Sequence, residues 1–175
     1  MGNVSTTYGN WGSFMNGVPF VRAWDRILNM GKYWNYSWTV KVDPDTVFVP
    51  NRLRPHLQHM PAEQPCWVRN WDHKFGLLGP IEVFSALGVQ LYGKRKSECI
   101  DSSNHGEMLA TSGEDGWIAT CMGRTLQVRG VRDLGILDCT GDMNKCWWSD
   151  GVPARHPFKD PDNFRTCLDR SISVG

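Results

Sequence analysis

Apolar positions along the chain switch between helical and extended spacing, and this switching predicts alternating helices and strands. Residues 16–31 fit a helix, because Phe20, Trp24 and Leu28 fall on one face and Gly31 suits a C-terminal cap. Such alternation is typical of α/β layers, here with a mixed sheet. The other elements that we expect are strands at 38–42, 47–49, 66–70 and 126–131, and helices at 50–60, 79–98 and 114–124.

The two ends of the chain depart from this pattern. Residues 1–15 are rich in Gly, Asn, Ser and Thr, so we expect an N-terminal arm before a single domain at 16–168 and a short tail at 169–175. From residue 138 onward the periodicity fades, and three of the six cysteines lie there. We therefore expect an irregular C-terminal region stapled by disulfides, and proximity in sequence favours pairing Cys139 with Cys146.

Bulk composition narrows the function classes. The chain has 175 residues, 41% of them hydrophobic and 21% charged, and a net charge of +1. That balance offers no electrostatic attraction for nucleic acid or an anionic membrane surface. We find no apolar run long enough for a transmembrane helix, and residues 1–5 lack the start of a signal peptide. We expect a globular domain with no nucleic-acid partner.

Cysteines and glycosylation sequons bear on the compartment. Six cysteines without a C-x-x-C pair argue against a structural zinc site. Sequons begin at Asn3 and Asn35. Together they favour the lumen of the secretory pathway or the extracellular space, with the lumen or surface of an organelle membrane complex as an alternative. Six free cysteines and two chance sequons in a cytosolic protein would be the simpler alternative.

The clearest chemical motif follows the strand at 38–42. Its apolar run ends at Asp43 and Asp45, which are spaced Asp-x-Asp. Ligands of open α/β sheets bind at the carboxyl ends of strands. Two carboxylates so placed can converge on Mn²⁺ or Mg²⁺, which keeps open positions for phosphate oxygens. The motif predicts a metal and diphosphate site of the kind used with nucleotide-sugars.

With these elements placed, the chain resembles glycosyltransferase domains of the GT-A type, in particular the fringe and core-1 galactosyltransferase-like group, over roughly residues 14–168. The resemblance implies an inverting, metal-dependent transfer of a hexose from a nucleotide-sugar to a glycan or protein acceptor. The segments that carry it are Phe20 to Leu28, Tyr36-Ser37-Trp38, Lys41-Val42-Asp43-Pro44-Asp45-Thr46, Gly79-Pro80, Gly113-Glu114-Asp115 and His156-Pro157-Phe158.

The resemblance also implies roles for single residues. It places Asp43 and Asp45 on the metal, and His156 completes the metal shell. Asp115 becomes the candidate general base on the acceptor hydroxyl, with Glu114 second.

Tryptophan supplies a candidate acceptor platform. The chain has nine tryptophans, and Trp147 and Trp148 are adjacent in the cysteine-rich region. Their faces suit sugar C–H surfaces, and core packing is the alternative explanation.

One departure from the family leaves two hypotheses open. Only about 37 residues precede the acidic strand, so much of the N-terminal half that holds the nucleotide in the family has no counterpart here. The chain is either an active glycosyltransferase domain or a retired module that serves as a structural or binding subunit of a larger protein assembly. The first hypothesis would be favoured if four side chains converge around an open cleft: Asp43, Asp45, Asp115 and His156.

Overall fold

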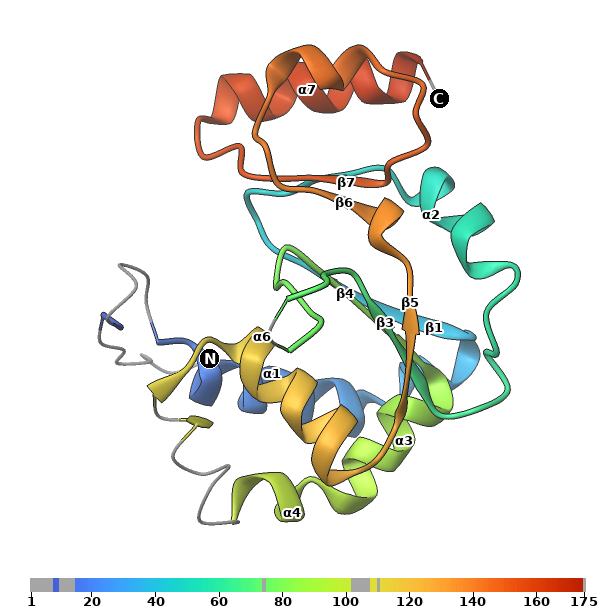
Figure 1. Cartoon of the computed structure of the whole chain (residues 1–175), viewed down its shortest axis with the longest axis vertical. Helices are drawn as coiled ribbons and strands as arrows, with labels where there is room; N and C mark the ends of the chain where they lie inside the picture. The colour runs from blue at the N-terminus through green and yellow to red at the C-terminus, as the bar shows by residue number, and fades with distance from the viewer. Residues whose placement is uncertain (1–7, 10–14, 74, 102–107, 110, 175) are drawn as a thin grey trace.

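The structure is a computed structural model that describes residues 8–9, 15–73, 75–101, 108–109 and 111–174. Two mixed sheets with helices around them confirm the expected α/β class (Figure 1). The principal helices are α1 (Gly17–Met30), α2 (Pro50–Leu57), α3 (Ala86–Arg95), α4 (Ser97–Ile100), α6 (Glu114–Thr120) and α7 (Pro161–Ser173). The strands are β1 (Trp38–Val42), β2 (Val47–Phe48), β3 (Cys66–Arg69), β4 (Ile81–Ser85), β5 (Arg129–Arg132), β6 (Leu137–Asp138) and β7 (Ala154–Arg155).

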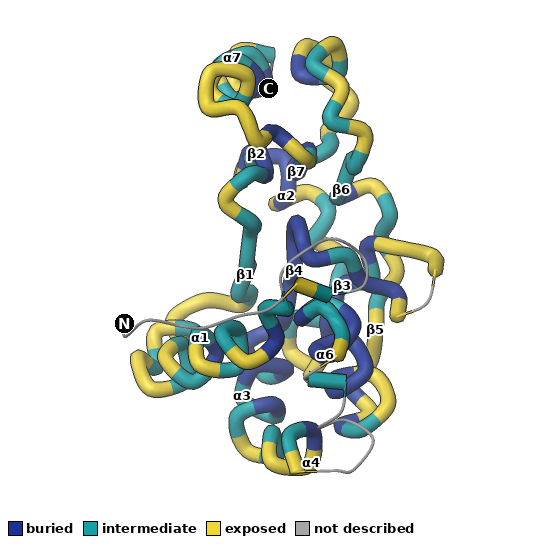
Figure 2. Tube along the Cα trace, turned by 90° about the vertical axis from the view of Figure 1, so that its left-hand side faces the viewer, coloured by how far each residue is buried: buried dark blue, intermediate teal, exposed yellow. Residues whose placement is uncertain are grey.

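The acidic segment joins the two sheets. The larger sheet has the order β1-β4-β3-β5, with β5 parallel to β3 and the other pairs antiparallel. The smaller sheet has the order β2-β7-β6. A tight turn leads from β1 into β2, closed by the Thr46 amide, which donates to the Asp43 carbonyl over 3.0 Å (Figure 2). Asp43 and Asp45 therefore lie in the turn that connects the larger sheet to the smaller one.

One face of the larger sheet packs against α1, α3 and α6. Trp24 of α1 meets Phe84 of β4 edge to face, with ring centroids 5.2 Å apart. Tyr92 of α3 meets Trp117 of α6 in the same way, at 6.3 Å. These buried aromatic rings form the largest core of the molecule.

The opposite face of the larger sheet packs against α2 and the smaller sheet. Val68, Ile81 and Val83 point to this side and contact Leu53 of α2 and Ala154 of β7. Strand β4 is buried along its whole length, as the dark blue trace in Figure 2 shows. The larger sheet thus forms the middle layer of the fold.

The C-terminal region is built around its own small core beneath α7. Val47, Phe158 and the Cys146–Cys167 disulfide are buried there. Asp160 begins α7 as its N-cap, accepting a hydrogen bond from the Asn163 amide at 2.9 Å. The disulfide ties α7 to the short helical segment η4 (Met143–Trp147), which contains Cys146.

The expected helix at 79–98 is wrong in its first third. Residues 81–85 form β4, and the helix begins only at Ala86. Ser85 sets the boundary, because its hydroxyl accepts hydrogen bonds from the Gly88 and Cys66 amides, both at 3.0 Å. An apolar run in the middle of a sheet is buried on both faces, so it shows no alternation that would separate it from a buried helix.

Two expectations for the C-terminal region need correction. Cys139 does not pair with Cys146: the disulfides are Cys99–Cys121 and Cys146–Cys167, and Cys139 and Cys66 are free thiols. The region is stapled as expected, but it also contains the regular helix α7, which extends to Ser173 and so includes most of the expected tail. Neighbours in the folded chain, not in sequence, decide which sulfurs meet.

None of the helices in the described part of the chain combines the length and apolar character that crossing a bilayer requires.

Candidate functional site

A largely but not fully buried lysine, Lys41, pairs with the carboxylates at the carboxyl end of β1. Lys41 of β1 stands directly opposite Glu82 of β4 in the antiparallel register. Because side chains alternate along strands, both point toward the helical layer that also receives Phe84. Glu114, in the first turn of α6, reaches the same point from the helical side.

The Lys41 ammonium contacts three carboxylates. Its Nζ lies 2.7 Å from Asp43 Oδ1 and 3.4 Å from Glu82 Oε1, and it also pairs with Glu114 Oε1. It donates a further hydrogen bond to the Gly79 carbonyl at 2.8 Å. We call Lys41, Asp43, Glu82, Glu114 and the adjacent Asp115 the carboxylate cluster. It brings together three sequence-predicted site residues: Asp43 on one side, and Glu114 and Asp115 from a distant part of the chain.

Asn16 fixes the α6 side of the carboxylate cluster. Its side-chain amide donates to Glu114 Oε2 at 2.8 Å, and its carbonyl oxygen accepts from the Glu114 backbone amide at 3.1 Å. Asn16 precedes α1 but makes no side-chain cap to that helix. It instead satisfies one of the free amides at the start of α6.

Burial and charge set the protonation of the carboxylate cluster. Burial alone would lower the pKa of Lys41, but Glu82, Glu114 and Asp43 outweigh it and raise that pKa above its ordinary value. Burial raises the pKa of Glu82 well above its ordinary value, against the opposing charge of Lys41. One ammonium cannot neutralise several carboxylates, so Glu82, which is fully buried, is the member that most readily keeps a proton.

Asp115 lies beside this ion-paired group and is held by backbone amides. Its carboxylate accepts from the Gly116 amide at 2.7 Å and from the Gly79 amide at 3.3 Å. Burial and the neighbouring Glu114 charge raise the pKa of Asp115, and the two amide hydrogen bonds oppose that rise. A carboxylate with a raised pKa is a better proton acceptor near neutral pH than an ordinary one.

The second aspartate of the Asp-x-Asp motif faces His156. Asp45 Oδ1 lies 3.4 Å from His156 Nδ1, and Thr46 Oγ1 lies 3.2 Å from the same nitrogen. The backbone fixes both partners, because the Phe158 amide donates to the Asp45 carbonyl and the His156 amide to the Asp138 carbonyl, each at 2.8 Å. The sequence-predicted pair of Asp45 and His156 therefore meets in space.

The donor set at this place suits a divalent cation only in part. Asp45 and His156 are partly exposed and offer a carboxylate oxygen and an imidazole nitrogen. Asp43 is turned toward Lys41. Across the described residues, no three His, Cys, Asp or Glu side chains gather closely enough to hold a metal by themselves. One carboxylate fits the oxygen-rich shell of Mg²⁺ or Mn²⁺, whereas the imidazole does not, so waters and substrate phosphates would have to supply most of the ligands.

The remaining sequence-predicted residues lie elsewhere. Trp147 and Trp148 are exposed, and their rings face the Arg170 guanidinium at 4.4 Å and the Lys145 ammonium at 5.6 Å. They belong to the C-terminal region that α7 covers. Asn35 is exposed, whereas Asn3 lies outside the described residues.

The sequence reading missed Lys41, Glu82 and Asn16. A signal was present for the first two, because each is the only charged residue in a strand that is mostly apolar. A charge at such a position is rarely buried without a partner. Asn16 gave no comparable signal, since an asparagine before a helix is an ordinary N-cap.

Neither a family model, nor a curated protein, nor a solved structure matches this chain. The resemblance to GT-A glycosyltransferases therefore remains a prediction that rests on the motifs and on the placement of their residues.

Proposed function

We propose that this chain is a GT-A-like glycosyltransferase domain that transfers a hexose from a nucleotide-sugar to a glycan or protein acceptor. The observation that carries the proposal is convergence. Asp43 and Glu114 meet at one lysine, Asp45 meets His156, and Asp115 adjoins the first group. All of them approach the carboxyl end of β1, where open α/β sheets bind ligands.

The proposed roles follow from charge and access. Asp45 and His156 would hold Mn²⁺ or Mg²⁺, with Asp43 as a third ligand if it exchanges Lys41 for the metal. The bound cation would supply Lewis-acid stabilisation of the leaving diphosphate. Asp115 would accept the proton of the acceptor hydroxyl, and its raised pKa suits that task.

A second candidate function is favoured by Lys41 itself. Its ammonium already contacts Asp43, Glu82 and Glu114, in the place where a metal ion would otherwise lie. A retired glycosyltransferase-like module, serving as a subunit of a larger assembly, would use this ion-pair group to hold β1, β4 and α6 together. The two functions differ in whether the site binds a donor diphosphate.

The deciding experiment is a calorimetric titration of the full chain with UDP in the presence and absence of Mn²⁺. The proposal predicts binding that requires the metal and is lost when Asp45→Asn and His156→Ala are combined. Asp72→Asn is the matched control, because Asp72 is an exposed carboxylate paired with Arg132. Its binding should equal that of the original chain.

Two results would count against an active transferase. Absence of metal-dependent UDP binding by folded, disulfide-intact protein would favour the retired module. If UDP binds but Asp115→Asn retains full turnover of a nucleotide-sugar, the general base has been assigned to the wrong residue.

A further inference from the structure

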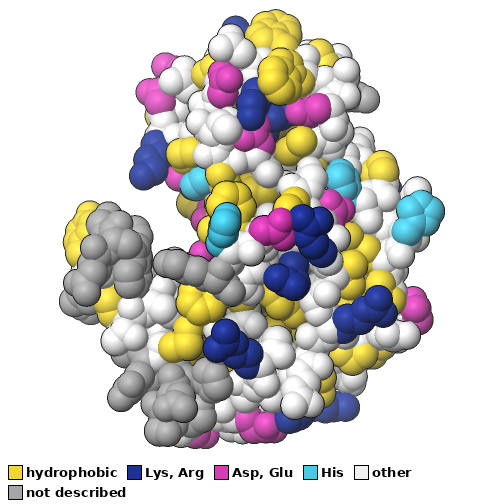
Figure 3. Space-filling view, viewed as in Figure 1, with side chains coloured by type: hydrophobic (Ala, Val, Ile, Leu, Met, Phe, Trp, Pro, Cys, Tyr) yellow, Lys and Arg dark blue, Asp and Glu magenta, His cyan; other side chains and the backbone are white. Residues whose placement is uncertain are grey.

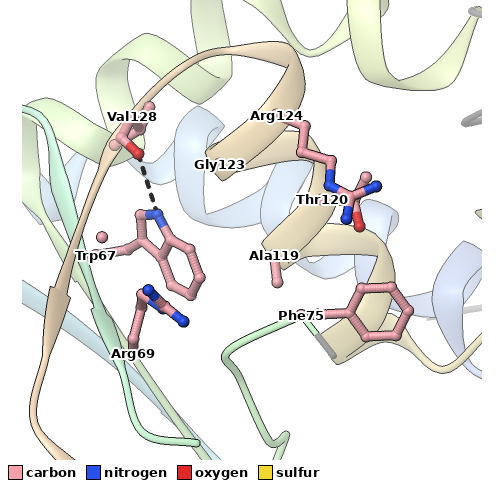
Figure 4. A pocket seen from close by; sticks show the side chains of 9 residues that line it. Trp67, Arg69, Phe75, Ala119, Thr120, Gly123, Arg124 and Val128 are labelled. Atoms are coloured by element: carbon pink, nitrogen blue, oxygen red, sulfur yellow. Dashed lines mark hydrogen bonds between the residues drawn. The ribbon is translucent and has the colours of Figure 1, made fainter. Parts of the chain in front are cut away.

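A cleft of about 310 Å³ lies beside the C-terminal half of α6, between that helix and strands β3 and β5. Figure 4 shows Trp67 and Arg69 on the strand side and Arg124, Thr120 and Phe75 on the helical side. Ligand sites for small molecules have volumes of this order and combine apolar walls with a few polar groups.

Neither arginine of the cleft has a carboxylate within ion-pair distance among the described residues, although the charge of Arg69 acts on Asp72 from farther away. Within the part of the chain that the structure describes, no Asp or Glu oxygen forms an ion pair with Arg69 or Arg124. By contrast, Arg132, which follows the cleft residue Gly130 by two positions, donates two hydrogen bonds to Asp72, at 2.8 and 2.6 Å. Figure 3 shows several basic side chains on the face of the molecule seen in Figure 1. The two guanidinium groups are thus free to bind an external anion.

Arg69 is held in place by packing. Its side chain lies so close to Gly130 that a Cβ there would come within 2.7 Å of Arg69 Cδ. A Cβ at Gly76 would likewise lie 2.6 Å from Arg69 Nε. Gly76 also adopts a φ of 81°, which favours glycine. Both neighbours lack a side chain where the arginine passes. A guanidinium ordered before binding loses less conformational entropy when it meets a ligand.

The rest of the cleft is suited to a flat ring. Trp67 is 3% exposed and its indole N–H donates to the Val128 carbonyl at 3.2 Å, so only a small part of its ring borders the cleft. Phe75, which is partly exposed, offers a second aromatic surface. The buried Thr120 hydroxyl at the cleft wall has no hydrogen-bond partner among the described residues. Aromatic surfaces that frame a polar spot are typical of sites for ring-bearing ligands.

We propose that this cleft binds a phosphate or sulfate ester of a ring compound. Its tetrahedral oxyanion would lie between Arg69 and Arg124, which present planar forks of donors suited to such groups. Its ring would pack against Trp67 and Phe75. The ring is either aromatic or a sugar, since both present flat apolar surfaces.

This site is separate from the carboxylate cluster. Glu114 and Asp115 occupy the first turn of α6, whereas Thr120 ends that helix and Gly123 and Arg124 lie in the following turn, η2 (Cys121–Thr125). The two places also have opposite charge, carboxylates in one and arginines in the other. The proposal therefore does not depend on the proposed transferase activity.

The test is calorimetric titration of the full chain, without metal, with phenyl phosphate, glucose 6-phosphate and inorganic phosphate. We expect one of the two esters to bind with one-to-one stoichiometry and at least about tenfold more tightly than inorganic phosphate. The preferred ester identifies the ring as aromatic or sugar. Arg69→Gln and Arg124→Gln should each weaken that binding by about tenfold or more.

Two further variants make the test specific. Gly123→Leu should block the ring, because a Cβ at this position lies 3.5 Å from Trp67 Cζ2 and a longer side chain would enter the cleft. Arg129→Gln removes an equal charge from β5, next to the cleft residue Gly130 but outside the cleft lining, and should leave binding unchanged. If Arg69→Gln does not fold, the exposed Arg124 and Gly123 variants decide.

The proposal is overturned if neither ester binds or if inorganic phosphate binds as tightly as both. It is also overturned if the control Arg129→Gln weakens binding as much as Arg124→Gln does.

Discussion

At the scale of single residues, Lys41 is the side chain that forms the most ion pairs, with three carboxylates around it. It is mostly buried, and it contacts carboxylates from the turn after β1, from β4 and from α6. Removing one partner of a buried ion pair leaves an uncompensated charge, which costs more than the pair ever contributes. We expect Lys41→Met to lower the free energy of unfolding by about 3 kcal/mol or more, measured by urea denaturation at neutral pH.

A matched lysine provides the control for Lys41. Lys96, which follows α3 as its C-cap, pairs with Asp25 of α1, and both side chains are about one third exposed. Solvent screens such a pair, so Lys96→Met should change the free energy of unfolding by about 1 kcal/mol or less. Equal effects of the two substitutions would mean that the carboxylates around Lys41 relax into water when the ammonium is removed.

The Lys41→Met variant should also depend on pH in a defined direction. Without the ammonium, the folded-state pKa values of Asp43 and Glu82, already raised by burial, rise further above their ordinary values of 3.8 and 4.5. An acid whose folded-state pKa is raised loses stability once the pH exceeds its unfolded-state pKa. The deficit relative to the original chain should therefore be largest at neutral pH and shrink toward about pH 4.

At the scale of elements, α3 packs so closely on β3 that there is no room for a side chain at Gly88. A Cβ at Gly88 would lie 2.8 Å from the Cys66 carbonyl oxygen, which belongs to the backbone of β3 and cannot move aside. Glycine inside a helix usually costs about 1 kcal/mol relative to alanine. Here we expect Gly88→Ala to destabilise the fold by about 1–3 kcal/mol in thermal and urea unfolding.

Gly93 in the same helix separates steric from conformational effects. A Cβ at Gly93 would meet the end of the Leu28 side chain at 2.6 Å, and that side chain can rotate. Gly93→Ala should therefore be the milder of the two substitutions. A Gly88→Ala variant as stable as the original chain would mean that α3 can lift from the sheet without cost.

Elements governed by local spacing were predictable, whereas elements defined by the sheet were not. Helix α1 and strand β1 match the expectation to within two residues, because an amphipathic face, the Gly31 cap and a β-branched run are all local signals. Strand β4 was mistaken for helix because it is buried on both faces and so shows no alternation; Ser85, the N-cap of α3, was the one local marker of its end. The same limit applies to the site: Asp43 and Glu114 were found as motifs, but their shared Lys41 depends on the register of β1 with β4.

At the scale of the whole molecule, the two disulfides lie in hydrophobic cores of different size. Cys99–Cys121 lies in the large aromatic core with Trp117 and Tyr92. Cys146–Cys167 lies in the small core beneath α7. The sequence separations are nearly equal, 22 and 21 residues, so a chain-entropy model gives both bridges a similar contribution of about 3 kcal/mol. Their consequences should differ because the surrounding packing differs.

Removing each bridge should therefore produce a different kind of opening. With Cys146→Ala and Cys167→Ala combined, we expect α7 to detach locally, because what then holds it is the small core and hydrogen bonds such as that from Arg52 to the Ser171 carbonyl at 2.7 Å. Amide exchange should accelerate across residues 161–173 while β4 stays protected. The matched double alanine variant of Cys99 and Cys121 should instead lower protection throughout the larger sheet. If both variants accelerate exchange equally in α7 and β4, the molecule unfolds as one cooperative unit and the C-terminal region has no separate stability.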